Sequence, residues 1–305
     1  MKFLSFILLL TAPFSLAGLD GLGYNSYSLL KPVNGFYQNP AAVNSLSKIG
    51  IGLMFNSQGG DFYDMNLAYG QRIGKMAAGL GVNYKTSGVL DILNETGEKT
   101  GTFRYSFVRV SLMAASSSFF LNRIPDIHYG IRLKLENEKA EEYSDTGYTA
   151  DIGLLYHFEF DKVQYIDRLG LFFSCENLGK NLADTDRARL LTGFLAYIPV
   201  VKDLSQVLVG LGVNRYLSSR LSDNSGFLFS LGFREALSLL SNSMKGYEIT
   251  AGVSFNASRA NRVLGSETGL EYGFSVESRR FSLGYDCTFN DATGNNYYGN
   301  LALKF

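Results

Sequence analysis

The chain has 305 residues, with 28 basic and 28 acidic side chains, so its formal net charge is zero. This balance excludes the strongly basic character that nucleic-acid binding requires. Glycine (33), tyrosine (19) and phenylalanine (23) are abundant, whereas proline (5) is scarce. Such a composition suits a β-barrel with small residues inside and aromatic rings at the membrane interfaces.

The first 17 residues have the pattern of a cleavable secretory signal. Lys2 precedes an apolar run over residues 3–10, and Ser15-Leu16-Ala17 supplies the small residues of a cleavage site. No later stretch approaches the roughly 20 apolar residues of a transmembrane helix. We therefore expect an exported protein whose membrane spans are strands, located in the bacterial outer membrane.

Residues 18–47 do not show strand alternation, and Asn39-Pro40-Ala41-Ala42 leads into the first predicted strand. One interpretation is an N-terminal arm whose Asn-Pro turn folds back and plugs the lumen. The other is that Asn39 and Pro40 only cap a periplasmic turn. A barrel of about fourteen strands encloses a wider lumen than an eight-stranded one, which favours the plug because an open lumen would leak.

Residues 48–305 contain about fourteen segments of alternating apolar and polar residues, separated by clusters of Gly, Asn, Asp and Ser. This pattern predicts an all-β fold: a transmembrane, antiparallel, up-and-down β-barrel with an N-terminal lumen plug. A change of phase between Phe107 and Val108 predicts a bulge in the fourth strand. Residues 188–198 and 206–216 are apolar on both faces and give the least clear strands.

Charged residues fall almost entirely in the polar phase of these strands. A charge that faces lipid at the bilayer midplane costs about 2–4 kcal/mol, so we expect the charges to line the lumen. A soluble β-sandwich would also alternate, but its polar face typically carries dense Lys and Glu. The candidate lumen-lining residues are Arg132, Lys134, Asp151, Glu248, Glu271, Arg280 and Asp286.

Turn lengths predict the orientation of the strands. With the N-terminus in the periplasm, residues 86–101, 137–145, 177–187 and 257–266 become external loops. The periplasmic turns are tighter, as at residues 71–75, except that residues 235–245 are long enough for a short helix.

The last strand carries Tyr297, Leu301, Leu303 and the terminal Phe305 on one face. This segment resembles the C-terminal assembly signal of outer-membrane barrels, although an edge strand of a soluble protein would look similar. We expect it to pair with the first strand and to meet outer-membrane lipid and the barrel-assembly machinery.

The sequence offers little for catalysis. Cys175 and Cys287 lie in the apolar phase of distant strands, so we expect two small lipid-facing residues rather than a disulfide. His128 and His157 lie in the polar phase without the partners of a metal site or an acyl-transfer triad. No phosphate loop, dinucleotide fingerprint or zinc spacing occurs. We expect no catalytic residues, no metal and no cofactor.

The chain resembles the FadL-type outer-membrane transporter superfamily, which includes PorV/PorQ-like proteins and spirochaetal barrels. The resemblance rests on Asn39-Pro40-Ala41-Ala42, the hairpin at residues 61–70, the strand count and Phe305. It covers residues 18–305, although the acidic residue that often precedes the Asn-Pro-Ala turn in that family is absent from residues 35–38. The resemblance implies uptake of hydrophobic small molecules such as long-chain fatty acids. It equally allows a PorV-like accessory scaffold in protein secretion or surface attachment. A structural or adhesive surface protein is a third alternative.

Overall fold

The structure is a computed structural model. It describes residues 39–45, 49–58, 62–93, 96–117, 127–140, 143–160, 165–180, 188–201, 204–217, 225–239, 244–258, 267–278, 280–290 and 294–304. The predicted signal at residues 1–17, most of the arm at residues 18–47, and Phe305 lie outside these ranges. No helix in the described ranges is long and apolar enough to cross a membrane.

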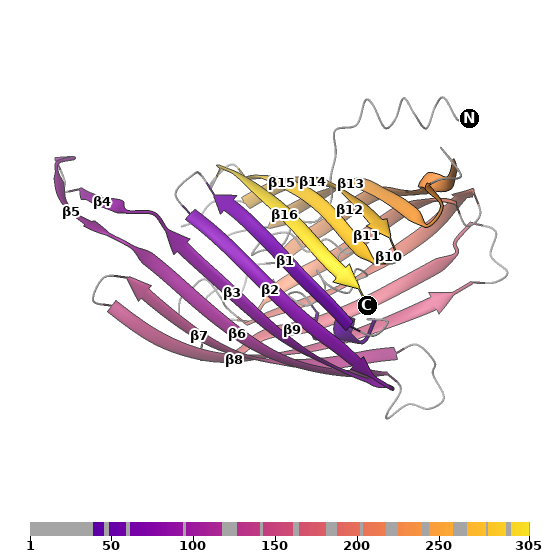
Figure 1. The fold of residues 1–305 in the computed structure, drawn as a ribbon, viewed down its shortest axis with the longest axis horizontal. Coiled ribbons are helices and arrows are strands. Elements are labelled where there is room, and N and C mark those ends of the chain that lie inside the picture. The colour runs from indigo at the N-terminus through magenta and orange to yellow at the C-terminus, as the bar shows by residue number, and fades with distance from the viewer. Residues whose placement is uncertain are drawn as a thin grey trace.

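Fourteen antiparallel strands form a closed barrel (Figure 1), which confirms the predicted all-β architecture. The barrel strands are β1 (Ile49–Gln58), β2 (Phe62–Ile73), β3 (Met76–Ser87), β6 (Tyr105–Ser117), β7 (Ile127–Ala140), β8 (Tyr143–Glu159), β9 (Arg168–Lys180), β10 (Arg189–Val201), β11 (Ser205–Tyr216), β12 (Ser225–Ala236), β13 (Tyr247–Ser258), β14 (Glu267–Ser278), β15 (Phe281–Asn290) and β16 (Gly294–Lys304). Two short strands, β4 (Leu90–Leu93) and β5 (Lys99–Phe103), form a separate hairpin. Within the described ranges, the 3₁₀-helices are η3 (Pro40–Ser45) and η5 (Leu237–Leu239).

The first and last strands close the barrel, as the terminal pattern predicts. Gly50 pairs with Lys304 and Leu53 pairs with Leu301 in an unbroken antiparallel register. Leu301 and Leu303 are exposed on the outer face, which is the face that the sequence assigns to lipid. The side chain of Tyr297 lies outside the described set, as does Phe305.

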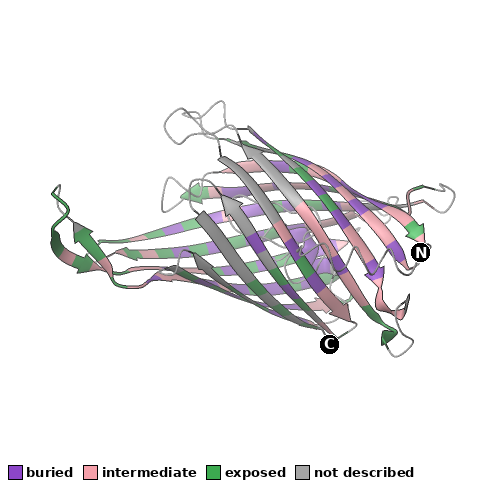
Figure 2. Cartoon of the chain, turned by 90° about the horizontal axis from the view of Figure 1, so that it is seen from above, coloured by how far each residue is buried: buried purple, intermediate pink, exposed green. Residues whose placement is uncertain are grey.

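Side chains alternate between an exposed apolar outer face and a buried inner face (Figure 2). On β7, Leu133 and Leu135 point outward and are 55% and 58% exposed, whereas Lys134 between them is 5% exposed. An outer surface of this kind is unfavourable in water and suits a hydrocarbon environment.

The predicted bulge in the fourth barrel strand is wrong. β6 pairs with β3 and β7 without a register shift. The change of phase arises because Phe107 faces inward and is buried, where the Arg109 guanidinium lies 5.1 Å from its ring centroid. Register shifts occur instead between β8 and β9, at Ala150 and Ile152, and between β10 and β11, at Pro199 and Val201.

Two of the predicted external loops are largely strand. The β4–β5 hairpin lies within residues 86–103, and it projects beyond one end of the barrel (Figure 1). Residues 137–140 and 143–145 continue β7 and β8 in paired register, from Asn137–Thr146 to Ala140–Tyr143. Hydrophobic alternation stops at these positions while hydrogen bonding continues, so the sequence pattern underestimates the strand length. At the opposite end, the long turn at residues 235–245 contains η5, in agreement with the predicted short helix.

Both cysteines are free thiols. Cys175 is partly exposed, but Cys287 is only 1% exposed. The prediction that Cys287 presents itself to lipid is therefore wrong, although its position in the outward phase of β15 is as expected.

Candidate functional site

The segment of residues 39–45 lies against the inner wall of the barrel. The Asn39 Nδ2 amide donates to the backbone carbonyls of Leu154 and Phe173, at 3.1 and 3.2 Å. The Asn39 Oδ1 atom accepts from the Ala41 backbone N–H at 2.9 Å. One asparagine side chain therefore fixes the start of η3 and joins it to β8 and β9.

A recess made by two glycines receives this segment. Gly130 of β7 and Gly153 of β8 are register partners. A Cβ atom at Gly153 would lie 1.9 Å from Asn39 Oδ1, and one at Gly130 would lie 2.5 Å from the Pro40 carbonyl carbon. These positions need glycine because the backbone of the inner segment occupies the place of a side chain.

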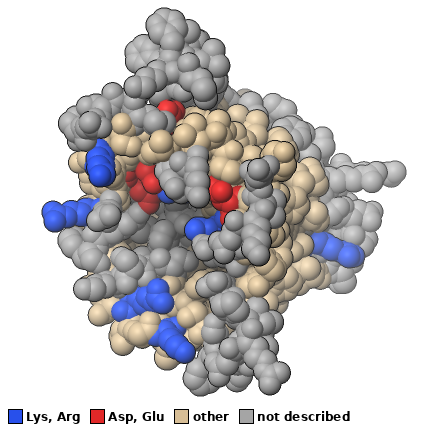
Figure 3. Space-filling view, turned by 90° about the vertical axis from the view of Figure 1, so that its right-hand side faces the viewer, with Lys and Arg blue, Asp and Glu red and all other residues tan. Residues whose placement is uncertain are grey.

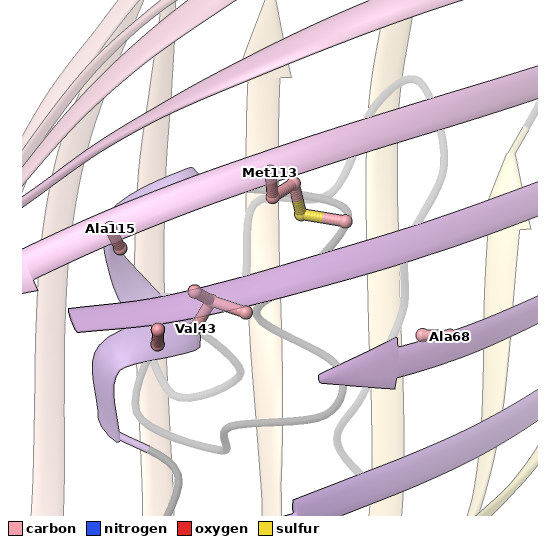
Figure 4. Packing of buried hydrophobic residues seen from close by; sticks show 5 residues of the cluster. Val43, Ala68, Met113 and Ala115 are labelled. Carbon is pink, nitrogen blue, oxygen red and sulfur yellow. The ribbon is translucent and has the colours of Figure 1, made fainter. Parts of the chain in front are cut away.

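Apolar contacts continue the attachment along η3. Val43 packs with Ala68, Ala77, Met113 and Ala115 from β2, β3 and β6 (Figure 4). All five side chains are buried, and four of them are alanine or valine. Because these side chains are small, η3 can approach the wall closely and pack directly against strands β2, β3 and β6.

Ala41 and Asn44 make the remaining contacts. Ala41 belongs to a buried cluster with Leu155, Phe172 and Leu191 of β8, β9 and β10. The Asn44 Nδ2 atom lies 2.8 Å from Nδ1 of His128. His128 thus faces inward, as its phase predicts, while the side chain of His157 is not among those described.

A buried ion-pair network occupies the inner wall beside this segment. Asp151 of β8 interacts with Arg132 of β7, and its Oδ1 lies 2.9 Å from the Lys134 Nζ atom. The Asn177 backbone N–H donates to the same oxygen at 2.8 Å, and the Asn177 side chain accepts from Lys134. Asn177 has a φ of 56°, which turns β9 so that its amide reaches Asp151 at the bulge.

The network extends over neighbouring strands. Arg109 donates to Glu136 at 2.7 Å, and Arg189 donates to Glu176 at 2.9 Å. Lys85 of β3 lies 3.4 Å from Asp64 of β2. Asn66 and Asn83 also donate to Asp64. We call this set, from β2 to β10, the ion-pair belt. Each buried charge in the belt contacts an opposite charge, and this pairing offsets the cost of removing the charges from water.

The predicted lumen residues do not all come together. Arg132, Lys134 and Asp151 meet in the belt, whereas Glu248 pairs with Arg234 on the other side of the barrel, on β13 and β12. Arg280 lies in the turn before β15 and is exposed. Glu271 and Asp286 occupy β14 and β15, but their side chains are outside the described set.

Sequence reasoning did not identify Arg109 as a residue of the inner wall. The change of phase at Phe107 was the sequence feature that could have revealed it. Sequence reasoning also missed an apolar strip on the inner wall. The strip consists of buried side chains from β8 to β11, namely Leu155, Phe172, Leu191, Leu195, Tyr197 and Leu208. The sequence feature that could have revealed the strip is that residues 188–198 and 206–216 carry apolar side chains on both strand faces, one of which turns inward. The Phe172 ring covers Gly193, where a Cβ atom would lie 2.4 Å from the ring.

The described residues contain no group of three His, Cys, Asp or Glu side chains that could hold a metal ion. Within these ranges, the inner wall therefore consists of the segment at residues 39–45, the ion-pair belt and the apolar strip.

Three similar solved structures are a hydrocarbon channel, a toluene transporter and a FadL homologue. The CymD monoaromatic hydrocarbon channel is 14% identical, with a TM-score of 0.57, and the match covers 94% of this chain and 95% of that chain. The toluene transporter TodX from P. putida is 10% identical (TM-score 0.58; 94% and 99% covered). A Pseudomonas aeruginosa FadL homologue is 9% identical (TM-score 0.54; 95% and 99% covered). No family model and no curated protein sequence matches the chain.

These similarities define the class of fold. The chain has the fold of FadL-type outer-membrane transporters, as the resemblance in its sequence predicts.

Proposed function

We propose that this protein is an outer-membrane channel for the uptake of small hydrophobic molecules, and that residues 39–45 belong to an arm that closes it. Long-chain fatty acids are one substrate class to test. Export through the signal at residues 1–17 and assembly through the terminal strand are parts of the same proposal. The FadL-type fold and the apolar outer face support the location.

The observation that carries the proposal is the apolar strip inside the barrel. A water-filled pore has no need of a row of Leu, Phe and Tyr side chains on its inner wall. In the structure these side chains are at most 5% exposed, so a solute reaches them once they are uncovered. An apolar solute that covers such a wall gains about 25 cal/mol per Å² of apolar surface removed from water. The strip thus suits a hydrophobic cargo.

The position of Ala41 suggests how passage is controlled. Ala41 packs on Leu155, Phe172 and Leu191, at one end of the strip. Displacement of η3 would uncover these side chains and offer them to a solute. We infer capture at the outer loops, movement along the strip and release after η3 moves.

The test is uptake by proteoliposomes that contain the refolded mature chain. Labelled toluene and a labelled fatty acid should enter faster than in protein-free vesicles. Deletion of residues 18–45 should in addition admit small polar solutes in a swelling assay. Unchanged swelling would disprove the plug, and the absence of hydrophobic uptake would disprove the transport function.

A second candidate is a PorV-like scaffold that anchors or shuttles secreted proteins. The observation that favours it is the projecting β4–β5 hairpin, on which Val89 and Ile92 are 54% and 37% exposed. A scaffold should lose protein binding when residues 88–103 are replaced by a short turn, while hydrophobic uptake stays absent. A channel should bind toluene or fatty acid and retain uptake in that variant.

A further inference from the structure

A cavity of about 190 Å³ lies where β11, β12 and β13 reach the end of the barrel that carries the short turns. It is lined by Leu204, Gln206, Arg234, Ala236 and Glu248. The Ala236 backbone N–H donates to the Leu204 carbonyl at 2.7 Å, which ties the turn before β11 to the end of β12. The space equals about six water molecules at ~30 Å³ each, enough for a small organic group.

The polar groups of this cavity leave hydrogen-bond acceptors unused. Both the Nε and Nη2 atoms of Arg234 donate to Oε2 of Glu248. Gln206 Nε2 donates to Asp167 at 3.0 Å. Within the described ranges, Oε1 of Glu248 and Oε1 of Gln206 have no hydrogen-bond partner. The cavity therefore offers two oxygen acceptors.

Charged side chains of both signs surround the cavity. Glu277 of β14 is the register partner of Glu248, and Asp167 holds Gln206. The cations near them are Arg234 and Arg168, the second of which lies 5.8 Å from the Tyr197 ring centroid. Figure 3 looks onto this end of the barrel and shows Asp and Glu among the Lys and Arg side chains there. A negatively charged ligand group that approached Oε1 of Glu248 would be repelled by that carboxylate.

The cavity adjoins the apolar strip. Leu208 is two residues from Gln206 on β11, so both side chains point to the same face of the strand. Leu208 pairs with Tyr197 and packs in the same buried cluster as Tyr197 and Leu195. Leu208 is buried, so the apolar lining of the cavity is Leu204 and Ala236. A ligand at this position can rest its apolar part on these two side chains and its polar end on the oxygen acceptors.

We propose that this cavity is a binding site for the hydroxyl end of a small, uncharged apolar molecule, a phenol or an alcohol. The hydroxyl group donates a hydrogen bond to Oε1 of Glu248 or of Gln206, and the hydrocarbon part lies against Leu204 and Ala236. A hydrocarbon lacks the donor, and a carboxylate brings only acceptors and a negative charge. The inference rests on the proposed function and narrows its substrate class.

The experiment compares three ligands of similar size and shape: 4-methylphenol, para-xylene and 4-methylbenzoate. Their binding to the refolded full chain is measured by calorimetry in detergent micelles, with empty micelles as reference. A hydrogen bond to a charged acceptor predicts that 4-methylphenol binds about 10-fold more tightly than the other two. Glu248→Gln should reduce this preference several-fold and leave para-xylene binding unchanged.

Two controls isolate the site. Asp145→Asn changes a carboxylate at the opposite end of the barrel, paired with exposed Lys180, and should change no affinity. Gln206→Leu should weaken 4-methylphenol binding by removing the second acceptor. Heat-modifiable migration on gels verifies that each variant is folded.

The outcomes separate the two proposals. Tighter binding of 4-methylbenzoate, tighter binding of the cation 4-methylbenzylammonium, or a 4-methylphenol affinity unaffected by Glu248→Gln would each overturn the hydroxyl site. If para-xylene still enters proteoliposomes in that case, the channel function stands. If none of the ligands enters, the channel function itself fails.

Discussion

Gly153→Ala tests the attachment of residues 39–45 with the smallest possible change. The added Cβ atom would lie 1.9 Å from Oδ1 of Asn39 and 2.8 Å from its Cγ atom, so the asparagine must leave its position. The strand itself should tolerate alanine because Gly153 does not adopt a positive φ. The substitution therefore removes the inner segment from the recess and keeps the wall.

The expected increase in the displaced population follows from the hydrogen bonds that the substitution removes. Asn39 Nδ2 gives up hydrogen bonds to Leu154 and Phe173, each of which contributes about 0.5–1.5 kcal/mol net. The sum of about 1–3 kcal/mol raises the displaced population by roughly 5- to 150-fold. Loss of the Ala41 packing adds to this effect.

The measurement is the rate of maleimide labelling at Ala41→Cys in a chain whose two native cysteines are replaced. Ala41 is fully buried, so labelling should be slow while Gly153 is retained and at least several-fold faster once Gly153→Ala is added. Gly130→Ala should act in the same way, and the double variant should add little because both displace one segment.

Gly299→Ala is the matched control, since it adds a Cβ to a wall glycine that has no atom within 4 Å of that position. Equal labelling rates in the Gly153→Ala and Gly299→Ala variants would refute the argument that the recess holds the segment.

Two further predictions concern the wall. Asp151→Asn leaves buried Arg132 and Lys134 without their carboxylate and should cost about 3–5 kcal/mol of unfolding free energy in urea titrations of the folded barrel. Asp145→Asn on the exposed hairpin should change that free energy very little, because solvent screens its pair with Lys180. Equal costs would contradict the role of burial. Leu112→Arg places a charge on the outer face, where Leu112 is 60% exposed, and should cost about 2–4 kcal/mol in lipid vesicles, much more than in detergent; a similar cost in both would argue against a lipid-facing surface.

The sequence predicted well which side chains point inward and which point outward. It predicted poorly which residues contact one another. Leu133 and Lys134 point to opposite faces in any register, because side-chain direction depends only on the period of two. The contact between Lys134 and Asn177 depends on a bulge in β9 and on the pairing of β7, β8 and β9. Neither feature has a local sequence signal.

The glycine recess shows a second limit of sequence reasoning. Gly130 and Gly153 match the many small residues expected on an inner wall, so their pattern alone does not distinguish them from other wall glycines. Their role appears only when Asn39 and Pro40, more than eighty residues earlier in the chain, are placed against them. The plug was an open alternative in the sequence for the same reason.

For the proposed channel, the distribution of contacts over the inner wall predicts which part would move on opening. The ion-pair belt joins strands through buried opposite charges, and separating such pairs costs several kcal/mol each. The segment at residues 39–45 is held by a few hydrogen bonds and small apolar side chains, which together cost less to break. Its departure uncovers Leu155, Phe172 and Leu191 while the belt beside it stays intact. Opening is therefore expected as a displacement of η3 inside a rigid wall, and a cross-link between η3 and β8 should abolish uptake without changing the stability of the barrel strands.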